Sequence, residues 1–448
     1  MKIKELIEVT GAEINNTDID LNSDVNISTD TRTIQKGEIY LPLKGASFDG
    51  ENFIEQALEK GAAASFCTKP HNIKSLLLKV PDTLTAYLQL ANYRRHKLNP
   101  VVVAITGSSG KTTTKELVAS VLSEKFKTFK TPLNHNNEIG FCQTVFEAPD
   151  DTEVLVLEMG MRGLGEIELL SKYAEPDVSI ISNVGTAHIG RLGSRENIAK
   201  AKCEIVSHQG VNKGVNKGVN VFIAHDDELI KKTVNFDGEK IYYSIKEVKI
   251  LDKNAHYSKF EYKGNTYELN VGGDYNIENA LSAIIAGGKL GLTTEQIQNG
   301  LKKYKPIEKR WEGVGVNING NNIEVINDSY NANPESMRAF VDTILELYKN
   351  YTLILGDMGE LGTNEIKYHS DLGKYINDKK NLSPDTKIIS IGNLSKNITD
   401  SITKCETHHF DSIEDTIPYL RKSINPETTL FLKASRSMKF EKIIELLK

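Results

Sequence analysis

A strand, a glycine-rich turn and a helix follow one another at residues 101–114 of this chain. Val101-Val-Val-Ala-Ile-Thr is an apolar run, Gly107-Ser-Ser-Gly is the turn, and Lys111-Thr-Thr-Thr opens a helical segment. In such a turn backbone N–H groups face phosphate oxygens, and the helix N-terminus adds its dipole. The pattern is G-x-x-G-K-T, because Ile105 stands where the full motif has its first glycine. The flanking strand and helix favour a phosphate loop over a plain glycine-rich turn.

The loop predicts a site for a nucleoside triphosphate. Lys111 would reach the β- and γ-phosphates, and the Thr112 hydroxyl would bind Mg²⁺. The residues that we expect around the phosphates are Gly107, Ser108, Ser109, Gly110, Lys111, Thr112 and Thr113.

Composition is that of a multi-domain enzyme with no membrane segment. The 448 residues predict three domains. A net charge of −5 gives no basic surplus, so we expect no nucleic-acid partner. Cys67, Cys142, Cys203 and Cys405 show no paired spacing, which fits a reducing cytosol. The charged start is no signal peptide, and no run approaches the ~18 apolar residues of a membrane span. We therefore expect a cytoplasmic protein.

Strands alternate with helices over residues 99–305, which predicts an α/β domain with a mostly parallel sheet and helices on both faces. In such a sheet ligands bind at the carboxyl ends of the strands. The expected strands are Val101–Ile105, Val154–Leu157, Val178–Ser182 and Val219–Ala224, and the expected helices are Lys115–Leu122 and Asn279–Lys289.

Smaller α/β units are expected on either side. Residues 1–98 contain a predicted strand at Glu38–Leu43 and a helix at Asn52–Lys60 that ends at Gly61. The pattern restarts over residues 306–448 as a Rossmann-like domain, with expected elements Ile323–Ile326, helix Glu335–Tyr348, Thr352–Leu355, Ile388–Ile391 and Thr429–Leu432. We therefore predict three domains, 1–98, 99–305 and 306–448.

A four-residue unit, Gly-Val-Asn-Lys, repeats within Gly210–Asn220. The period is too short for a solenoid, whose repeats run to 20 residues or more. A tandem expansion in a surface loop is the favoured interpretation.

Three side chains follow the predicted strands of the central domain. Glu158 ends the strand that begins at Val154, where phosphate-loop proteins commonly place a carboxylate for Mg²⁺. His188 lies beyond the next strand, and Lys202 lies on a probable helix. From the residues alone, a surface carboxylate, a solvated loop histidine and a solvated lysine remain the alternatives.

Short motifs succeed one another along the chain: Gly107-Ser-Ser-Gly-Lys-Thr-Thr, Asn136-Asn-Glu-Ile-Gly140, Glu158-Met-Gly160, Asn183-Val-Gly-Thr-Ala-His188, Ala201-Lys202-Cys-Glu-Ile205, Asp328-Ser-Tyr-Asn-Ala-Asn-Pro-Glu-Ser-Met337, Gly356-Asp-Met-Gly-Glu-Leu-Gly362 and Lys433-Ala-Ser-Arg-Ser-Met438. In this order they resemble the Mur ligases of peptidoglycan synthesis. Asp30-Thr-Arg32, Leu43-Lys-Gly45 and Phe48-Asp-Gly50 resemble the N-terminal domain of that family.

The motifs that begin at Asp328 and Gly356 are similar to the branch that adds D-alanyl-D-alanine to UDP-N-acetylmuramoyl-tripeptide. The resemblance implies that ATP phosphorylates the tripeptide carboxylate and that the dipeptide amine attacks the acyl phosphate. It implies a UDP-substrate domain, a central ATP domain and a C-terminal domain for the amine, in a monomer that uses Mg²⁺. It leaves open whether the third residue of the tripeptide is lysine or diaminopimelate.

The resemblance also implies roles for individual residues. The catalytic residues would be Lys111, Glu158, His188 and Lys202, and the Mg²⁺ ligands Thr112, Glu158, His188 and Lys202, with Lys202 carried as a carbamate. Further nucleotide contacts would be Asn276, Arg310 and Asp328. The substrate-binding residues would be Asp30, Thr31, Arg32, Lys44, Gly45, Asp49, Gly50, Asn136, Asn137, Asn331, Asn333, Lys433, Ser435 and Arg436.

Some positions depart from the family pattern or allow another interpretation. Tyr275 precedes Asn276 where the family has histidine, and Ile223-Ala-His225-Asp-Asp stands where it has Asn-Ala-Asp-Asp. The structural alternatives are a surface ion pair for Arg310, a helix N-cap for 328–333 and a plain basic loop at 433–436. The functional alternatives are the ligase that adds the third amino acid, folylpolyglutamate synthase, and a phosphate-loop ATPase switch.

Overall fold

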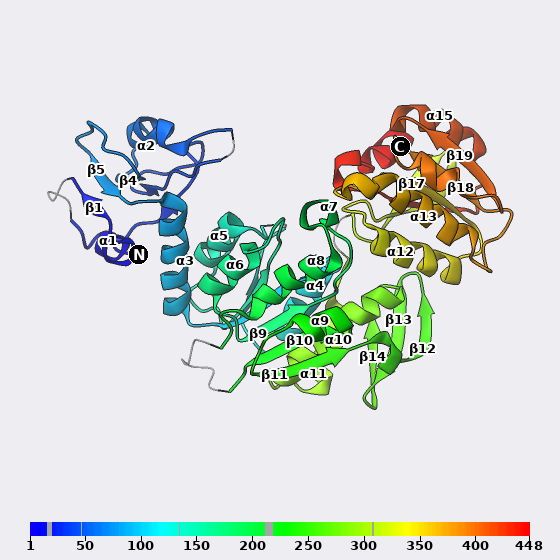
Figure 1. The fold of residues 1–448 in the computed structure, drawn as a ribbon, viewed down its shortest axis with the longest axis horizontal. Helices are drawn as coiled ribbons and strands as arrows, with labels where there is room; N and C mark the ends of the chain where they lie inside the picture. Colours follow the sequence, from blue (N-terminus) through cyan, green and yellow to red (C-terminus); the bar gives the residue numbers. More distant parts are fainter. Residues whose placement is uncertain (16–19, 46, 134, 211–217, 307–308) are drawn as a thin grey trace. The chain divides into compact units, whose positions relative to one another are not determined.

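The computed structural model describes residues 1–15, 20–45, 47–133, 135–210, 218–306 and 309–448 (Figure 1). They form two compact units. The first comprises residues 1–100, 131–153 and 172–174, and the second comprises residues 101–130, 154–171 and 175–448. Most of the Gly-Val-Asn-Lys repeat, residues 211–217, lies outside the described residues.

The first unit is built on a small mixed sheet. Its strand order is β1-β5-β4-β3-β2, with β1 antiparallel to β5 and the other pairs parallel. The strands are β1 Glu13–Ile14, β2 Ile27–Ser28, β3 Ile39–Tyr40, β4 Ala64–Cys67 and β5 Leu76–Lys79. The helices are α1 Ile3–Thr10, α2 Ile54–Glu59, α3 Thr83–Leu98 and α5 Glu138–Glu147. The predicted strand at 38–43 is therefore shorter, and a 3₁₀ turn, Gly50–Phe53, precedes the predicted helix.

Helix α5 belongs to this unit although the sequence predicted residues 131–153 as part of the central domain. The α5 residue Phe146 stacks on Tyr87 of α3, with ring centroids 5.5 Å apart. Arg94 of α3 pairs with Asp150 at 2.6 Å. The stacked pair adds about 0.5–1.5 kcal/mol to the burial of the two rings. The domain boundary at residue 98 stays a prediction.

The second unit begins with a six-stranded sheet in which every neighbouring pair is parallel. Its order is β11-β10-β9-β6-β8-β7, with bounds β6 Val101–Thr106, β7 Thr128–Lys130, β8 Val154–Glu158, β9 Val178–Ile181, β10 Val221–His225 and β11 Glu239–Tyr243. The predicted parallel sheet is confirmed. The connection after β6 leads to β7 on one side of the sheet, and the connection after β9 leads to β10 on the other side. The strand order therefore reverses between β6 and β9, and open α/β sheets bind ligands at the carboxyl ends of the strands at such a point.

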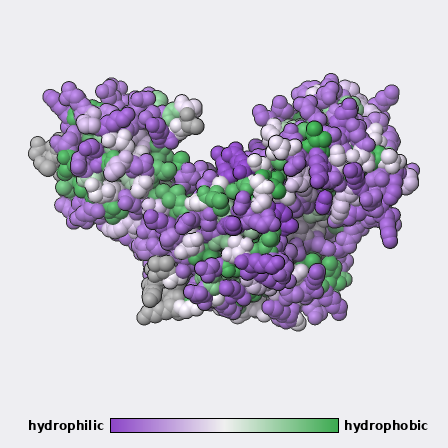
Figure 2. All heavy atoms as spheres, viewed as in Figure 1, coloured by the Kyte–Doolittle hydropathy of each residue, from purple (hydrophilic) through white to green (hydrophobic). Residues whose placement is uncertain are grey.

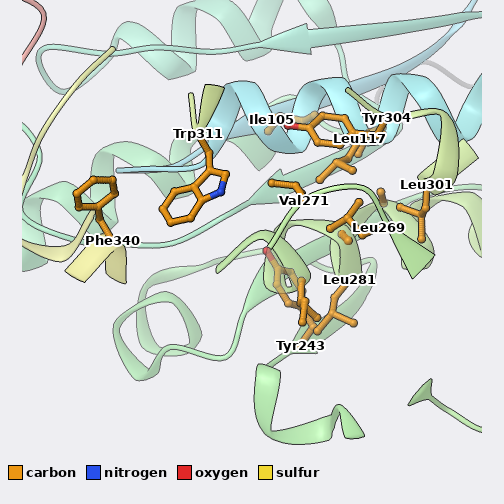
Figure 3. Close-up of a cluster of buried hydrophobic side chains, with 14 of the residues drawn as sticks. Ile105, Leu117, Tyr243, Leu269, Val271, Leu281, Leu301, Tyr304, Trp311 and Phe340 are labelled. Carbon is orange, nitrogen blue, oxygen red and sulfur yellow. The ribbon is translucent and has the colours of Figure 1, made fainter. Parts of the chain in front are cut away.

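Helices cover this sheet and bury an apolar core. They are α4 Lys111–Leu122, α6 Glu166–Ala174, α7 Ile189–Leu192, α8 Arg195–Cys203, α9 Glu228–Thr233, α10 Asp274–Lys289 and α11 Thr294–Lys303. Figure 3 shows part of the core, to which Leu117 of α4, Leu281 of α10 and Leu301 of α11 all contribute. Gly300 of α11 lies so close to α4 that an added Cβ would lie 2.4 Å from Val121 Cα.

A three-stranded antiparallel sheet, which the sequence did not predict, follows. It consists of β12 Lys249–Asn254, β13 Tyr257–Tyr262 and β14 Asn265–Leu269. Lys263 and Gly264 form the two-residue turn between β13 and β14, and both have positive φ, 47° and 77°. That is the type I′ hairpin turn.

The third sheet of the second unit has the order β15-β16-β20-β17-β18-β19. Only β15 and β16 pair antiparallel among its strands, which are β15 Glu312–Ile318, β16 Asn321–Asn327, β17 Tyr351–Gly356, β18 Lys387–Ile391, β19 Glu406–Phe410 and β20 Thr429–Lys433. Its helices are α12 Pro334–Leu347, α13 Glu365–Asn377, α14 Lys396–Thr399, α15 Ile413–Ser423 and α16 Glu441–Leu447. The predicted Rossmann-like pattern of alternating strands and helices is present.

None of the described helices combines the length and apolar character of a membrane-spanning segment. Figure 2 shows hydrophilic residues over most of the face that it draws, with apolar residues scattered among them.

We expect Gly300→Ala to lower the free energy of unfolding by about 1–3 kcal/mol, because an overpacked contact costs that much. The new methyl group would meet backbone atoms of α4, which cannot move without shifting the helix. Gly288→Ala is the matched control, since nothing lies within 4 Å of the Cβ added there on α10. Thermal unfolding followed by circular dichroism measures both variants. Equal melting temperatures would contradict the packing argument.

Candidate active site

The phosphate loop joins β6 to α4 as the sequence predicted. Gly110 has φ +77° and is the N-cap of α4, and an added Cβ would lie 2.5 Å from Asn279 Oδ1, so only glycine fits. Lys111 is the first helical residue, and its Nζ donates to Gly107 O at 2.9 Å. The N–H groups of the first helical turn have no partner four residues back, so they face the position of an anion.

Asn183, at the start of the loop after β9, braces the phosphate loop. Its main-chain oxygen accepts from Ser108 N at 3.1 Å, and its Oδ1 accepts from Ser109 N at 3.0 Å. The Ser108 hydroxyl accepts from Gly185 N at 2.9 Å. Two of the amides expected at the phosphates therefore bind Asn183 in this structure. The remaining donors come from the first turn of α4.

Arg310 reaches the same loop from the segment before β15. Its guanidinium donates to Thr112 Oγ1 at 2.8 Å and lies 4.0 Å above the ring of Tyr330. Its neighbours Lys309 and Trp311 both have positive φ, 62° and 56°. Such strain is kept where surrounding contacts enforce it, commonly at functional sites. In this structure Arg310 contacts Thr112 and Tyr330 rather than a surface carboxylate.

Glu158 ends β8 and is buried, and its charge interacts with that of Lys111 in the phosphate loop. Its carboxylate lies 3.9 Å from Lys115 Nζ, and Lys115 is 3.2 Å from Glu116. Burial lowers the pKa of Lys111, and Arg310 lowers it further, while Glu158 opposes both effects. Lys115 thus partly balances the carboxylate that we predicted as a Mg²⁺ ligand.

Lys202 lies in the last turn of α8 with only 1% of its surface exposed. Within the described chain its Nζ makes no hydrogen bond or ion pair. Burial moves its pKa well below the ordinary value, and the charge of Lys111 lowers it further. A solvated helical lysine is therefore excluded, and the neutral amine is favoured by its surroundings.

The loop that carries His188 touches two carboxylates. His188 Nδ1 lies 2.5 Å from Glu360 Oε2, and Thr186 Oγ1 donates to Glu335 Oε2 at 2.9 Å. The first contact is a salt bridge only when the imidazole is protonated, and with a neutral ring it is a close polar contact.

The third sheet brings its motifs together at the carboxyl ends of neighbouring strands. Asp328 follows β16 and Lys433 ends β20, and their side chains form an ion pair at 2.6 Å. Lys433 Nζ also donates to Asn331 O at 3.2 Å. Asn333 caps α12 by accepting from Ser336 N at 2.8 Å, as the N-cap alternative predicted.

The loop after β17 is held by hydrogen bonds to Ser435, Ser395 and His369 of other segments. The main-chain oxygen of Asp357 accepts from Ser435 N and Oγ at 3.0 and 2.7 Å, and its carboxylate accepts from Ser395 N at 2.7 Å. Buried His369 donates through Nδ1 to Glu365 O at 2.7 Å, so its Nε2 accepts from Met358 N at 2.9 Å.

Arg436, Asn276 and Tyr275 also make contacts within the second unit. Arg436 pairs with Glu441 at 2.9 Å, and Asn276 Nδ2 donates to Gly272 O at 2.7 Å. Tyr275, which replaces the family histidine, packs edge-on against Trp311 with centroids 6.2 Å apart.

Candidate substrate residues of the first unit form two local clusters. Asp30 pairs with Arg32 at 2.6 Å, which is the main reason that the pKa of this largely solvated carboxyl falls to about 2. Thr31 Oγ1 donates to Gln56 Oε1 at 3.2 Å. Lys44 and Asp49 pair through their backbones, and Gly45 N donates to Phe48 O at 2.9 Å.

Two further glycine and asparagine positions of this unit have structural roles. An added Cβ at Gly50 would lie 2.5 Å from Leu43 O, so glycine is required there. Asn137 caps α5 by accepting from Gly140 N at 2.9 Å, next to the predicted substrate residue Asn136.

The chemistry of the predicted Mg²⁺ ligands fits a hard cation in part. Thr112 and Glu158 offer oxygen atoms, which such cations prefer. Lys202 offers only nitrogen unless it is modified. Among the described residues, no group of three or more His, Cys, Asp or Glu side chains is placed to hold a metal ion.

Sequence reasoning missed the residues that connect these motifs. Asn183, Lys115, Glu335 and Glu360 lie within or beside recognised motifs, but their contacts join segments that are far apart in the chain. Only the position of Asn183, directly after a strand next to β6, gave a usable signal.

Comparison with known proteins places these motifs in a family. The Mur ligase family catalytic domain matches residues 25–111, the Mur ligase middle domain matches 105–287, and the Mur ligase glutamate ligase domain matches 309–436. The chain belongs to the Mur ligase family.

Individual Mur ligases match over nearly the whole chain. The UDP-N-acetylmuramoyl-tripeptide–D-alanyl-D-alanine ligase of Bacillus subtilis (strain 168) is 35% identical over 99% of this chain and 97% of its own length. A crystal structure of MurF from Acinetobacter baumannii superposes with a TM-score of 0.87 at 28% identity, covering 100% of this chain and 98% of that one. MurF from Thermotoga maritima, in complex with ADP, gives a TM-score of 0.80 at 25% identity, covering 94% and 96%.

We expect His369 to make this Mur ligase sensitive to acid. Burial lowers the pKa of His369 below that of the unfolded chain, so the unfolded state takes up the proton first as the pH falls. Stability should therefore fall as the pH drops through about 6.5. Protonation would also place a second N–H against Met358 N.

His369→Gln should unfold at a lower temperature at pH 7.5, since a lost buried hydrogen bond costs about 1–3 kcal/mol. Its melting temperature should change less than that of the wild type between pH 7.5 and 5.5. His256→Gln, at an exposed position, is the control. An unchanged pH slope in His369→Gln would contradict the assignment.

Proposed function

We propose that this chain joins D-alanyl-D-alanine to UDP-N-acetylmuramoyl-tripeptide at the expense of ATP. The γ-phosphoryl group passes from ATP to the C-terminal carboxylate of the tripeptide, which gives ADP and an acyl phosphate. The amine of the dipeptide attacks the acyl carbon and loses a proton, phosphate leaves, and an amide bond forms. The product is a peptidoglycan precursor.

The observation that carries the proposal is the convergence of basic side chains on the phosphate loop. Lys111, Arg310 and Lys202 come from three separate segments, Lys111 and Arg310 both bond within the loop or its helix, and Lys111 interacts electrostatically with each of the other two. Transfer of a phosphoryl group to a carboxylate brings two anions together, so positioning and neutralisation of charge dominate the barrier. Relatives with this activity match over almost the entire chain.

The chain's own residues divide the work of ATP binding. The first turn of α4 and Lys111 hold the β- and γ-phosphates, and Asn183 keeps the loop in shape. Arg310 neutralises charge near Thr112. Asn276 and Asp328 contact the nucleoside. Mg²⁺, when bound through Thr112, Glu158 and His188, supplies further positive charge at the transferring phosphoryl group.

We infer that Lys202 carries a carbamate. A neutral, buried amine is the form of lysine that adds to CO₂, and the carbamate it yields replaces a nitrogen ligand with oxygen atoms suited to Mg²⁺. The new negative charge would also pair with Lys111, whose field reaches Lys202.

The remaining assignments follow the domain prediction. Residues 1–98 bind the UDP-substrate through the Asp30–Arg32 and Lys44–Gly50 segments, residues 99–305 bind ATP, and residues 306–448 bind the amine substrate. Asn136, Asn137, Asn331, Asn333, Lys433, Ser435 and Arg436 complete the substrate contacts. Lys433 would then exchange its ion pair with Asp328 for the carboxylate of a substrate. We expect the enzyme to act as a monomer in the cytoplasm.

The functional alternatives are less favoured. The ligase that adds the third amino acid and folylpolyglutamate synthase share the fold, but the full-length relatives at 30–35% identity are D-alanyl-D-alanine ligases. An ATPase switch gives no reason for the Asp30–Gly50 and Asp328–Met337 motifs.

We expect phosphate release only when UDP-N-acetylmuramoyl-tripeptide and D-alanyl-D-alanine are both present with ATP. A coupled phosphate assay on the purified protein, omitting each substrate in turn, makes the test. Lys111→Met is the control for contaminating ATPases and should lower the rate by about 10²-fold or more. Robust turnover of ATP alone would sink the ligase proposal in favour of the switch.

Lys202→Ala should be nearly inactive, and a short carboxylic acid added to the assay should restore part of its activity by replacing the carbamate. Lys200→Ala is the matched control, because Lys200 lies on the same helix but is exposed. The wild type incubated with ¹³C-labelled bicarbonate should show a carbamate carbon signal by NMR that Lys202→Ala lacks. Full activity of Lys202→Ala would refute the carbamate.

A further inference from the structure

A contact between two loops of the second unit falls outside the roles assigned so far. One is the loop after β9, residues 183–188, with helix α7. The other is the loop after β17, residues 357–362. The contact between His188 Nδ1 and the Glu360 carboxylate, at 2.5 Å, joins them side chain to side chain. Gly190 N also donates to Glu360 O at 3.1 Å, which joins them backbone to backbone.

Both residues of this side-chain contact have a strained backbone. His188 has φ +64° and Glu360 has φ +61°, a left-handed conformation that costs a residue with a side chain on the order of 1 kcal/mol or more. Histidine is among the residues found more often in this region, so the conformation is the less usual one for Glu360. Two residues in this conformation therefore face each other across one contact, and such strain persists where surrounding contacts enforce it.

The backbones approach so closely that two glycines are required. A Cβ added to Gly190 would lie 2.6 Å from Gly362 N and 2.9 Å from Glu360 O. A Cβ added to Gly362 would lie 2.7 Å from Gly190 Cα. The two loops therefore fit only when neither position carries a side chain.

The contact is connected to the phosphate loop. The segment that ends in His188 begins with Asn183, whose backbone and side chain hold Ser108 and Ser109. The Glu360 carboxylate is near enough to raise the pKa of Lys111. A displacement of the 357–362 loop would therefore affect the nucleotide site in two ways. It would move the backbone of residues 183–188, and it would change the electrostatic effect of Glu360 on Lys111.

We propose that Glu360 is a positioning residue that fixes the imidazole of His188, and that the Gly190–Gly362 contact is the latch that brings it there. The proposal rests on the proposed function for its kinetic consequence only. The Glu360 carboxylate lies 2.5 Å from Nδ1 and so restricts the orientation of the ring, while Nε2 takes no part in this contact. The latch makes the placement of His188 depend on docking of the 357–362 loop onto α7.

The kinetic test compares Glu360→Gln with Glu365→Gln. Glu365 lies five residues further on, and within the described chain its side chain makes no hydrogen bond or ion pair. We expect Glu360→Gln to lower kcat by about 10- to 100-fold, the cost of a misplaced catalytic group, with the KM for ATP and for tripeptide little changed. Glu365→Gln should match the wild type. If the contact were merely structural, Glu360→Gln would lower the melting temperature and leave kcat unchanged, which would overturn the proposal.

A second measurement does not depend on catalysis. Hydrogen exchange in a peptide covering residues 186–193 should be slow in the wild type, because Gly190 N is bonded to Glu360 O. Gly190→Ala should speed this exchange and lower kcat, whereas Gly288→Ala, with room for its methyl group, should do neither. Equally slow exchange in Gly190→Ala and the wild type would refute the latch.

The outcomes separate the two proposals. If the wild type releases phosphate only with both substrates while Glu360→Gln keeps its full kcat, the ligase proposal stands and the positioning role fails. If the wild type shows no dipeptide-dependent turnover, the proposed function fails, and the exchange experiment alone decides whether the latch exists.

Discussion

The burial of Lys111 and Lys202 within reach of one another is the constraint on which the active site depends. Burial lowers the pKa of both amines, Arg310 lowers that of Lys111 further and Lys111 lowers that of Lys202 further, so the charged form of each amine lies in an unfavourable environment. An anion bound at the first turn of α4 relieves this for Lys111, and a carbamate on Lys202 relieves it for both. Folding thus contributes to the affinity for the nucleotide, since it places and desolvates the Lys111 side chain before the nucleotide binds.

Parallel sheets explain how motifs spread over more than 300 residues come to surround these lysines. In the first sheet of the second unit, β6, β8 and β9 end in the phosphate loop, Glu158 and the Asn183–His188 loop. In the third sheet, β16, β20 and β17 end in Asp328, Lys433 and the Asp357 loop. Each sheet therefore presents its functional side chains on one edge. Contacts such as Arg310–Thr112 then link one edge to the other.

The sequence predicted what is local and periodic. Apolar runs of five or six residues followed by glycine or a helix signal define the buried parallel strands, and the structure reproduces them within a few residues. The antiparallel sheet escaped prediction because its first strand alternates weakly and Lys263-Gly264 replaces the Asn-Gly that marks a type I′ turn. The burial of Lys202 escaped physical reasoning altogether, since a lysine on a helix is ordinarily solvated. Only the resemblance to the family singled it out.

The residues that connect the motifs could not be predicted because their meaning lies in tertiary contacts. Glu360 and Gly362 belong to one motif and His188 belongs to another, and about 170 residues separate the two motifs in the sequence. Nothing in either segment says that a carboxylate will meet an imidazole or that two glycines will touch. The structure supplies that pairing, and with it a reason for left-handed backbone at two residues with side chains. Strain at both ends of one contact is stable only while the contact is made. The same strain favours release of the contact, which suits a site that, by the proposed reaction, must admit three substrates and release three products.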